Sequence, residues 1–194
     1  MGASVFVSGA AGAVGSMAGQ FAALAGAKRV VGSAGSVEKT KYLVDELGYD
    51  AAFNYKDGPV LQQLQSAFPE GLDIFFDNVG SDHLAAAVEV LNDFGRVALC
   101  GTISAYNASE HRAVPVNAFK IVTKRLRMQG FIAFDHEDLR KDFDSRVGAW
   151  LENGQLAYRE TVSQEIEAVP AAFTGMLTGA NTGKAIIRLA DDQA

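Results

Sequence analysis

Short apolar runs alternate with helical patterns over the first two thirds of the chain. Runs rich in β-branched and aromatic residues predict strands at 4–8, 29–32, 51–54, 72–76, 95–100 and 126–132. Apolar residues at helical spacing predict helices over 14–24, 36–47, 60–68 and 84–91. Such alternation is typical of a parallel sheet with helices on both faces. Because crossovers between parallel strands are right-handed, the pattern predicts a doubly wound six-stranded α/β sheet with strand order 3-2-1-4-5-6.

A loop of small residues joins the first predicted strand to the first helix. It reads Gly9-Ala10-Ala11-Gly12-Ala13-Val14-Gly15. The three glycines let the backbone approach a bulky anion, and the helix that begins there offers unpaired N–H groups and the positive end of its dipole. Ala10 stands where the first glycine of the familiar G-x-G-x-x-G pattern belongs, and a tight helix–strand contact is the structural alternative. The position of the loop favours the pyrophosphate cradle of a Rossmann dinucleotide-binding unit.

The alternation stops after the sixth predicted strand. A long helix is expected from about Glu137 to Leu151, and a strand, a helix and a strand are expected at 158–162, 168–177 and 184–189. These last segments do not extend the first sheet. We therefore expect a Rossmann domain over residues 1–155, followed at 156–194 by a C-terminal remnant of a second domain.

No carboxylate follows the second predicted strand, which ends Val31-Gly32-Ser33-Ala34-Gly35-Ser36. Enzymes that prefer NAD place an Asp or Glu there to bind the ribose 2′-hydroxyl. Small and hydroxyl residues leave room for a 2′-phosphate, and Lys39 in the next helical turn could neutralise it. The alternative for Lys39 is an ordinary exposed helix lysine. The missing acid favours NADP(H) and also weighs against a methyltransferase.

Polar residues follow the fourth and fifth predicted strands, whose carboxyl ends should face the nicotinamide half of the cofactor. Asn78 could hydrogen-bond ribose hydroxyls, and Tyr106 could offer its phenol to a reacting carbonyl. An Asx turn and a surface aromatic are the structural alternatives. Cys100 closes a buried strand, which favours inert packing over nucleophilic chemistry.

Composition and charge exclude several classes of protein. The 194 residues are 48% hydrophobic and 21% charged, as in a globular protein. The net charge of −6, without a basic cluster, disfavours nucleic acid as a partner. No apolar run reaches the roughly 18 residues of a membrane span. Cys100 is the single cysteine, so we expect no intramolecular disulfide and no thiolate zinc cluster, and a reducing cytoplasm as the location.

The chain begins almost directly with a strand, so no signal or transit peptide is expected and the start resembles that of an excised domain. His83, His111 and His136 lie in different segments, so no metal site is expected from them. Asp73 and Asp77 flank an apolar strand without an acid–base partner. We interpret these two as capping or turn residues.

Together these segments resemble a known family. The matching stretches are Gly12-Ala13-Val14-Gly15-Ser16, Gly35-Ser36 with Glu38-Lys39, Phe53-Asn54-Tyr55-Lys56, Phe76-Asp77-Asn78-Val79-Gly80, Phe94-Gly95-Arg96, Cys100-Gly101-Thr102-Ile103-Ser104-Ala105-Tyr106-Asn107 and Asn181-Thr182-Gly183-Lys184. The chain resembles the cofactor domain of zinc-independent medium-chain dehydrogenases/reductases. It is most similar to the branch of prostaglandin reductase, leukotriene B4 12-hydroxydehydrogenase and 2-alkenal (curcumin) reductase.

The resemblance implies NADPH-dependent reduction of the carbon–carbon double bond of an α,β-unsaturated aldehyde or ketone, without a metal. It implies that the residues that contact NADP(H) are Ala11, Gly12, Ala13, Val14, Gly15, Ser36, Lys39, Tyr55, Asn78, Cys100, Gly101, Thr102, Ile103, Ser104, Tyr106, Phe131, Ile132, Ala133 and Asn181. Within that set, Lys39 and Tyr55 would hold the 2′-phosphate. Tyr106 would reach the nicotinamide ribose and the substrate, and is the candidate catalytic residue.

Two departures from the family matter. Thr123 stands where some members carry a tyrosine near the substrate. The N-terminal domain that covers the active-site cleft in the family is missing from this chain. We therefore expect the chain to bind NADP(H) but to reduce alkenals poorly or not at all by itself.

The family also suggests an assembly and leaves alternative functions open. Strand six, Leu126–Phe131, would be a sheet edge, and in the family such edges pair into homodimers. An NADPH quinone reductase of the same superfamily would share almost every cofactor residue. A non-catalytic NADP-binding sensor or interaction module is the third possibility.

Overall fold

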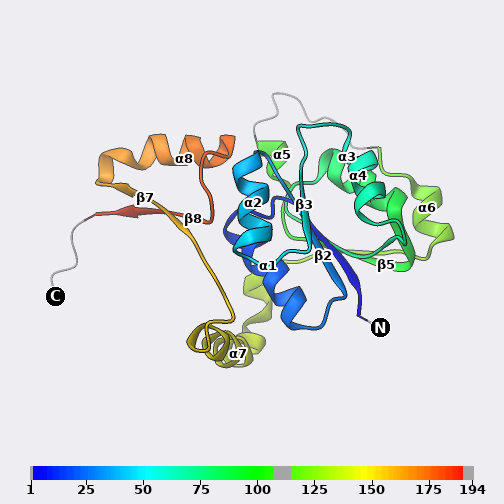
Figure 1. Ribbon diagram of the computed structural model, residues 1–194, viewed down its shortest axis with the longest axis horizontal. Coiled ribbons are helices and arrows are strands. Elements are labelled where there is room, and N and C mark those ends of the chain that lie inside the picture. The colour runs from blue at the N-terminus through cyan, green and yellow to red at the C-terminus, as the bar shows by residue number, and fades with distance from the viewer. Residues whose placement is uncertain (1, 107–114, 190–194) are drawn as a thin grey trace.

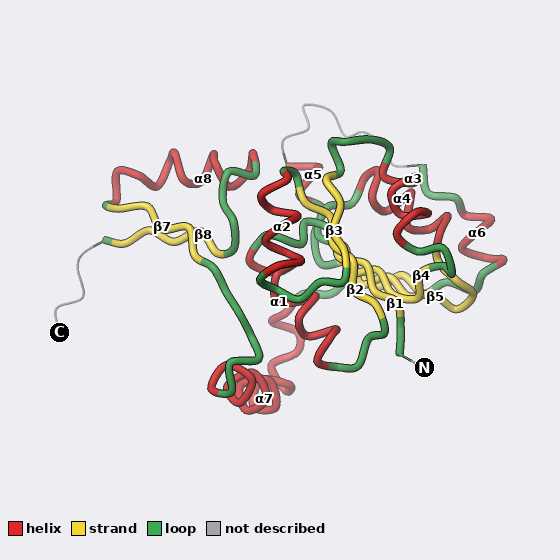
Figure 2. Tube along the Cα trace, viewed as in Figure 1, coloured by secondary structure: helices red, strands yellow, loops and turns green. Residues whose placement is uncertain are grey.

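The computed structural model describes residues 2–106 and 115–189. Six parallel strands form one sheet in the order β3-β2-β1-β4-β5-β6, which confirms the predicted topology (Figures 1 and 2). The strands are β1 (Ser4–Val7), β2 (Arg29–Ala34), β3 (Ala51–Asn54), β4 (Leu72–Asp77), β5 (Leu91–Leu99) and β6 (Arg127–Gly130). The order reverses between β1 and β4, so the carboxyl ends of these two neighbouring strands define the switch point of the sheet.

Helices cover both faces of this sheet because successive residues of a strand point to opposite sides. Val5 and Val7 of β1 belong to one apolar cluster, which includes Leu43, whereas Phe6 belongs to the other, which includes Leu64 and Ala87. The first cluster packs under α1 and α2, and the second under α3 and α4. These helices are α1 (Ala13–Leu24), α2 (Val37–Asp45), α3 (Val60–Ala67) and α4 (Ser81–Val90). No helix of the described residues is long and apolar enough to cross a membrane.

The chain after β5 departs from the expected boundaries. A short helix, α5 (Ile103–Tyr106), forms where a loop was expected, and α6 (Ala118–Thr123) was not predicted. Asn117 caps α6 by accepting a hydrogen bond from the Lys120 N–H at 3.3 Å. The long helix expected from about Glu137 begins later in the structure: a 3-10 segment, η1 (Ala133–Leu139), precedes α7 (Arg140–Glu152).

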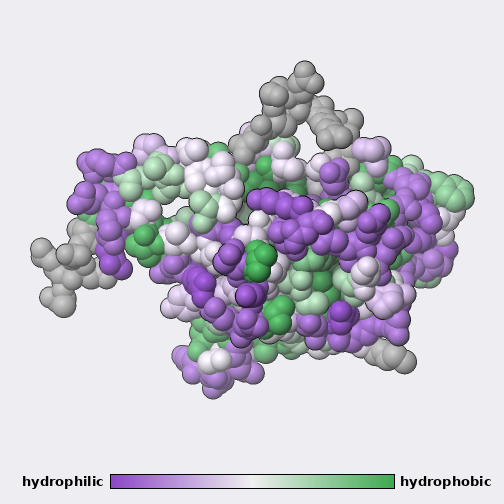
Figure 3. Space-filling view, turned by 45° about the horizontal axis from the view of Figure 1, so that its top comes forward, coloured by the Kyte–Doolittle hydropathy of each residue, from purple (hydrophilic) through white to green (hydrophobic). Residues whose placement is uncertain are grey.

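The C-terminal segments form a second, two-stranded parallel sheet with one helix. Its elements are β7 (Glu160–Gln164), η2 (Ile166–Ala168), α8 (Val169–Thr178) and β8 (Lys184–Arg188). This order agrees with the strand, helix and strand expected from the sequence. No residue of these four elements is buried. This unit lies beside the first sheet, at the left of Figure 1. In the space-filling view of Figure 3, its surface shows hydrophobic and hydrophilic residues next to one another.

Candidate functional site

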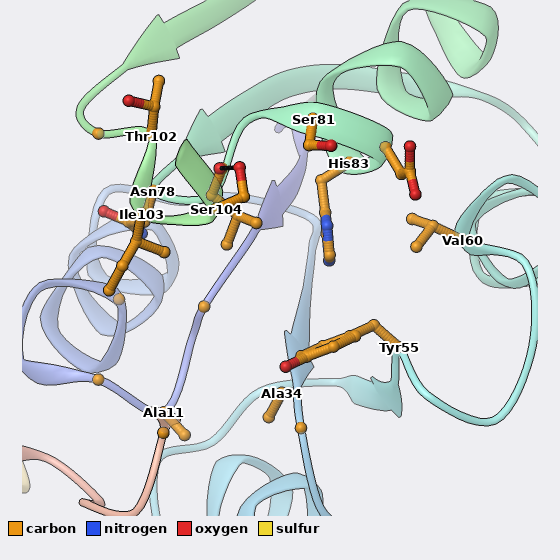
Figure 4. A pocket seen from close by; sticks show the side chains of 18 of the residues that line it. Ala11, Ala34, Tyr55, Val60, Asn78, Ser81, His83, Thr102, Ile103 and Ser104 are labelled. Carbon is orange, nitrogen blue, oxygen red and sulfur yellow. Dashed lines mark hydrogen bonds between the residues drawn. The ribbon is translucent and has the colours of Figure 1, made fainter. Parts of the chain in front are cut away.

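A large cavity opens at the carboxyl ends of the sheet strands. Its volume is about 1060 Å³, and it extends from the glycine loop past the ends of β2, β3, β4 and β5 to the segment between α8 and β8 (Figure 4). Ligands of doubly wound proteins bind at this edge, outside the strand ends at the switch point. The cavity therefore lies where the sequence places a cofactor.

The glycine loop forms an open cradle at the beginning of α1. A Cβ on Gly15 would lie 2.5 Å from the Gly9 carbonyl oxygen, so only glycine permits this close packing. No side chain caps α1, and no acidic residue lies in its first turn. Within the described chain, the N–H groups of Ala13, Val14 and Gly15 donate no hydrogen bond to the protein. Free N–H groups at a helix beginning can receive an anion such as a pyrophosphate.

Basic residues gather at the end of β2, where the sequence lacks an acid. Lys39 is half-buried, and its Nζ donates a hydrogen bond of 2.8 Å to the Gly179 carbonyl. Burial and the nearby charge of Lys56 lower the pKa of Lys39. The Lys56 ammonium also lies 5.8 Å from the ring centre of Tyr55. Two ammonium groups that repel one another would both be stabilised by a phosphate dianion placed between them.

Ser36 has a structural task in this corner. Its hydroxyl caps α2 by accepting a hydrogen bond from the Lys39 N–H at 3.3 Å. The Ser36 side chain is not among the residues that line the cavity. The cap fixes the first turn of α2 and with it the backbone from which the Lys39 side chain projects.

A buried carboxylate organises the turn after β4. Asp77 has no exposed surface, and its Oδ1 accepts hydrogen bonds from the Ser8 hydroxyl at 2.8 Å and from the N–H groups of Val79 and Gly80 at 2.9 Å each. The Asn78 side-chain amide donates to the Ser8 carbonyl at 2.7 Å. Asp77 is therefore a turn residue, as predicted, and it holds Asn78 at the cavity wall.

The segment after β5 is tied to the same turn. The Ile103 N–H donates to the Asn78 carbonyl at 3.2 Å, and the Ser104 N–H donates to the Val79 carbonyl at 3.3 Å. Burial and the charge of Asp77 raise the pKa of the Cys100 thiol, so it stays protonated at neutral pH. Tyr106 lines the cavity from α5 and is 69% exposed. Its phenol can therefore meet a ligand from this side.

The structure brings most of the predicted residues to one cavity. Those that line it are Ala11, Gly12, Ala13, Val14, Gly15, Lys39, Tyr55, Asn78, Cys100, Gly101, Thr102, Ile103, Ser104, Tyr106 and Asn181. Phe131, Ile132 and Ala133 are not among its lining residues. The Phe131 ring packs instead against Phe76, with ring centres 6.1 Å apart. Their cofactor contacts stay predictions, and Asn107 and His111 lie outside the described residues.

Several lining residues were not singled out from the sequence. They include Lys56, Val60, His83, Gly179 and Lys184. Lys56 and Lys184 belong to motifs that also contain the predicted residues Tyr55 and Asn181. This proximity along the chain is a signal by which both lysines could have been predicted. His83 is a lone histidine on α4, and nothing in its neighbourhood along the chain indicates that it is only 5% exposed. Burial lowers its pKa, although the charges of Asp77 and Asp82 oppose this shift.

Comparison with known families assigns the central part of the chain. The model of the family described as zinc-binding dehydrogenase matches residues 13–147. The family description implies a metal in some of its members, so the residues must be tested against it. The described residues contain no group of three or more His, Cys, Asp and Glu side chains that could hold a metal ion. The described part of the chain therefore does not fit a zinc site.

Individual relatives narrow the assignment. A 2-alkenal reductase (NADP(+)-dependent) from Nicotiana tabacum is 43% identical over 187 residues, which are 96% of this chain and 54% of that protein. Prostaglandin reductase 1 from Rattus norvegicus is 42% identical over 189 residues, covering 96% of this chain and 57% of that protein. The chain thus spans little more than half the length of these relatives.

A solved structure agrees with these relatives. The crystal structure of CurA in complex with NADPH from Vibrio vulnificus matches with a TM-score of 0.92 and 38% identity. The match covers 98% of this chain and 58% of that one. The chain therefore belongs to the zinc-binding dehydrogenase family, within the medium-chain dehydrogenase/reductase superfamily and its branch of prostaglandin reductases, alkenal reductases and CurA.

Proposed function

We propose that the chain binds NADP(H) in the cavity at the strand ends. The observation that carries this proposal is the acid-free end of β2 with Lys39, Lys56 and Tyr55 around it. Ala11 to Gly15 would hold the pyrophosphate on the free N–H groups of α1. The NADP in the printed name of the tobacco relative and the NADPH in the CurA complex support the choice of cofactor.

We further propose that the whole protein reduces the carbon–carbon double bond of α,β-unsaturated aldehydes or ketones. The similarity to a 2-alkenal reductase supports this substrate class. NADPH supplies a hydride when it is bound. Asn78 and the segment from Cys100 to Ser104 would hold the nicotinamide side. The Tyr106 hydroxyl would donate a hydrogen bond to the substrate oxygen as negative charge develops on it.

We expect the chain by itself to bind the cofactor but to turn over an enone slowly. Ile103 is 38% exposed and Tyr106 is 69% exposed, so this end of the cavity is open to water. Water weakens the electrostatic interactions that a closed site would strengthen. A rate typical of enzymes from this chain alone would contradict the proposal.

We also propose a homodimer through residues 126–131. In the sheet, β6 pairs only with β5, which leaves its other edge without a partner strand in the described chain. Pairing with the same strand of a second copy would cover this edge and satisfy its hydrogen-bonding groups. A sedimentation profile that stays monomeric at high protein concentration would overturn this part.

Calorimetric titration with NADPH and NADH tests the cofactor assignment. A charge-assisted contact to the 2′-phosphate contributes about 1.5–3 kcal/mol, so we expect NADPH to bind roughly 10- to 100-fold more tightly than NADH. Lys39→Ala should lose most of this preference. Lys41→Ala is the matched control, because Lys41 is exposed on the same helix and is not among the lining residues. Equal affinity of the unaltered chain for both cofactors would overturn the assignment.

A further inference from the structure

His83 is a buried histidine in the wall of the cavity. It projects from α4 toward Tyr55 in Figure 4. Its ring lies parallel to that of Phe6, with ring centres 6.3 Å apart, and meets the Tyr55 ring edge to face at 5.5 Å. Its Nε2 is buried and makes no hydrogen bond within the described chain. A buried polar nitrogen without a partner costs free energy, so its presence requires an explanation.

The position of His83 relative to the basic residues identifies the part of the cavity concerned. Tyr55 lies beside Lys56 and Gly35, at the proposed 2′-phosphate end. The adenine base and the 2′-phosphate of NADP are attached to the same ribose, so the base must lie close to this corner. The His83 ring, which contacts Tyr55, is therefore at the adenosine end and away from the reacting groups.

The surroundings of His83 suit a flat heterocycle. Pro59, Val60, Leu61 and Ala86 line the same part of the cavity with apolar surface. Ligand pockets of this type combine apolar walls with a few polar atoms that fix orientation. Because burial lowers its pKa, the imidazole is uncharged at neutral pH and can donate a hydrogen bond from one nitrogen and accept one at the other.

We propose that His83 is a specificity-determining residue for the nucleotide base, and that its unprotonated Nε2 accepts a hydrogen bond from the 6-amino group of adenine. The Tyr55 ring, which is 40% exposed and contacts the His83 ring, is the side chain we expect to shift when the base reaches Nε2. This proposal rests on NADP(H) binding in the cavity. The competing explanation is a buried water between His83 Nε2 and Asp77 Oδ2, which also lacks a partner in the described chain.

Titrations with two small nucleotides separate these explanations. Adenosine 2′,5′-bisphosphate and inosine 2′,5′-bisphosphate carry the same phosphates and differ in the donors and acceptors of the base. Inosine has a carbonyl oxygen where adenine has its amino group, so it offers no donor to Nε2. One hydrogen bond in a buried site corresponds to about a five- to tenfold preference, which we expect to favour the adenine ligand. His83→Phe keeps the ring but removes both nitrogens, and should bind the two ligands equally. His83→Gln places an amide near the Nε2 position that can accept from the adenine amino group or donate to the inosine carbonyl, so it should bind both ligands more tightly than His83→Phe and show a smaller preference than the unaltered chain.

The possible failures of this experiment are distinguishable. If neither nucleotide nor NADPH binds the unaltered chain, the proposed cofactor site fails and the inference fails with it. If both nucleotides bind equally and Lys39→Ala weakens both, the cofactor site stands and the role of His83 is overturned. A preference that survives in His83→Phe also overturns it and favours the buried water. The nitrogen-15 histidine spectrum of the unaltered chain needs no variant: the His83 Nε2 resonance should move more with the adenine ligand, and identical shifts would contradict the proposal.

Discussion

The two sheets of this molecule are built from the same kind of parallel strand but differ in how they are stabilised. Every residue of β1 is buried, and Phe6, Phe75 and Leu72 have no exposed surface. In the C-terminal unit, Ile166 is 60% exposed and Phe173 is 58% exposed. Local sequence patterns therefore specify the elements in both regions, whereas only the first region buries enough apolar surface to form its own core.

The second region is held by a few long-range hydrogen bonds. The Gly183 N–H donates to the Ala11 carbonyl at 2.8 Å. The Gln20 side chain forms two bonds with the backbone of Ala157, at 2.8 and 2.9 Å. Lys39 bonds to Gly179. These bonds attach the C-terminal unit to the glycine loop and to α1 and α2, which are the same elements that form the proposed cofactor site.

The largest expected difference between the regions concerns phenylalanine. Phe75→Ala removes a fully buried ring that stacks on Phe6 at 4.9 Å, and should lower the free energy of unfolding by about 3–5 kcal/mol. Phe173→Ala, in α8, should change it by only about 0.5 kcal/mol. Urea unfolding of both variants measures the contrast. Equal losses would mean that the exposed face of α8 is covered in solution.

A smaller effect is expected at Gly183, whose N–H also bonds to the glycine loop of the first region. Gly183 has φ +69°, and a Cβ there would lie within 1.8 Å of the Arg159 carbonyl oxygen. Gly183→Ala should lower the free energy of unfolding by about 2–4 kcal/mol, because the backbone strain at positive φ and the overlap with Arg159 add to one another. It should also speed hydrogen exchange over residues 159–188. Gly154→Ala is the control, since φ is +66° but nothing lies within 4 Å, and it should cost about 1 kcal/mol. Equal costs would show that the contact with Arg159 relaxes freely.

The smallest expected effect is a loss of folding stability at acidic pH, caused by His83 in the first region. Burial lowers the pKa of His83 below its usual 6.5, so the unfolded chain takes up this proton at a higher pH than the folded chain does. The folded state therefore loses stability as the pH falls below about 6.5. His83→Phe should lessen this loss. Thermal unfolding between pH 8 and 5 measures it, and parallel curves for the two proteins would contradict the assignment to His83.

The sequence predicts the first sheet well because two general rules fix it. Strands that alternate with helices require crossovers, and the single hand of those crossovers determines the strand order. The same reasoning brings Gly12, Lys39, Asn78 and Tyr106 to one cavity, since the carboxyl ends of parallel strands meet at one edge. Here the chemistry of the site follows from topology.

Other features depend on contacts that no local pattern records. The burial of His83 requires Phe6 from β1 and Tyr55 from the end of β3, which are distant along the chain. The bond from Lys39 to Gly179 joins residues 140 positions apart. The 3-10 segment before α7, with the non-helical backbone of His136, has no proline or glycine to announce it. These features need the three-dimensional structure.

The bond between Gly183 and Ala11 has a consequence for the time at which the site forms. The glycine loop leaves the ribosome about 170 residues before its partner Gly183 does. Closing so long a segment is slow compared with forming the local helices and turns. We therefore expect the nucleotide pocket to be completed only after Gly183 has been synthesised, so that cofactor binding distinguishes chains that include Gly183 from shorter nascent ones.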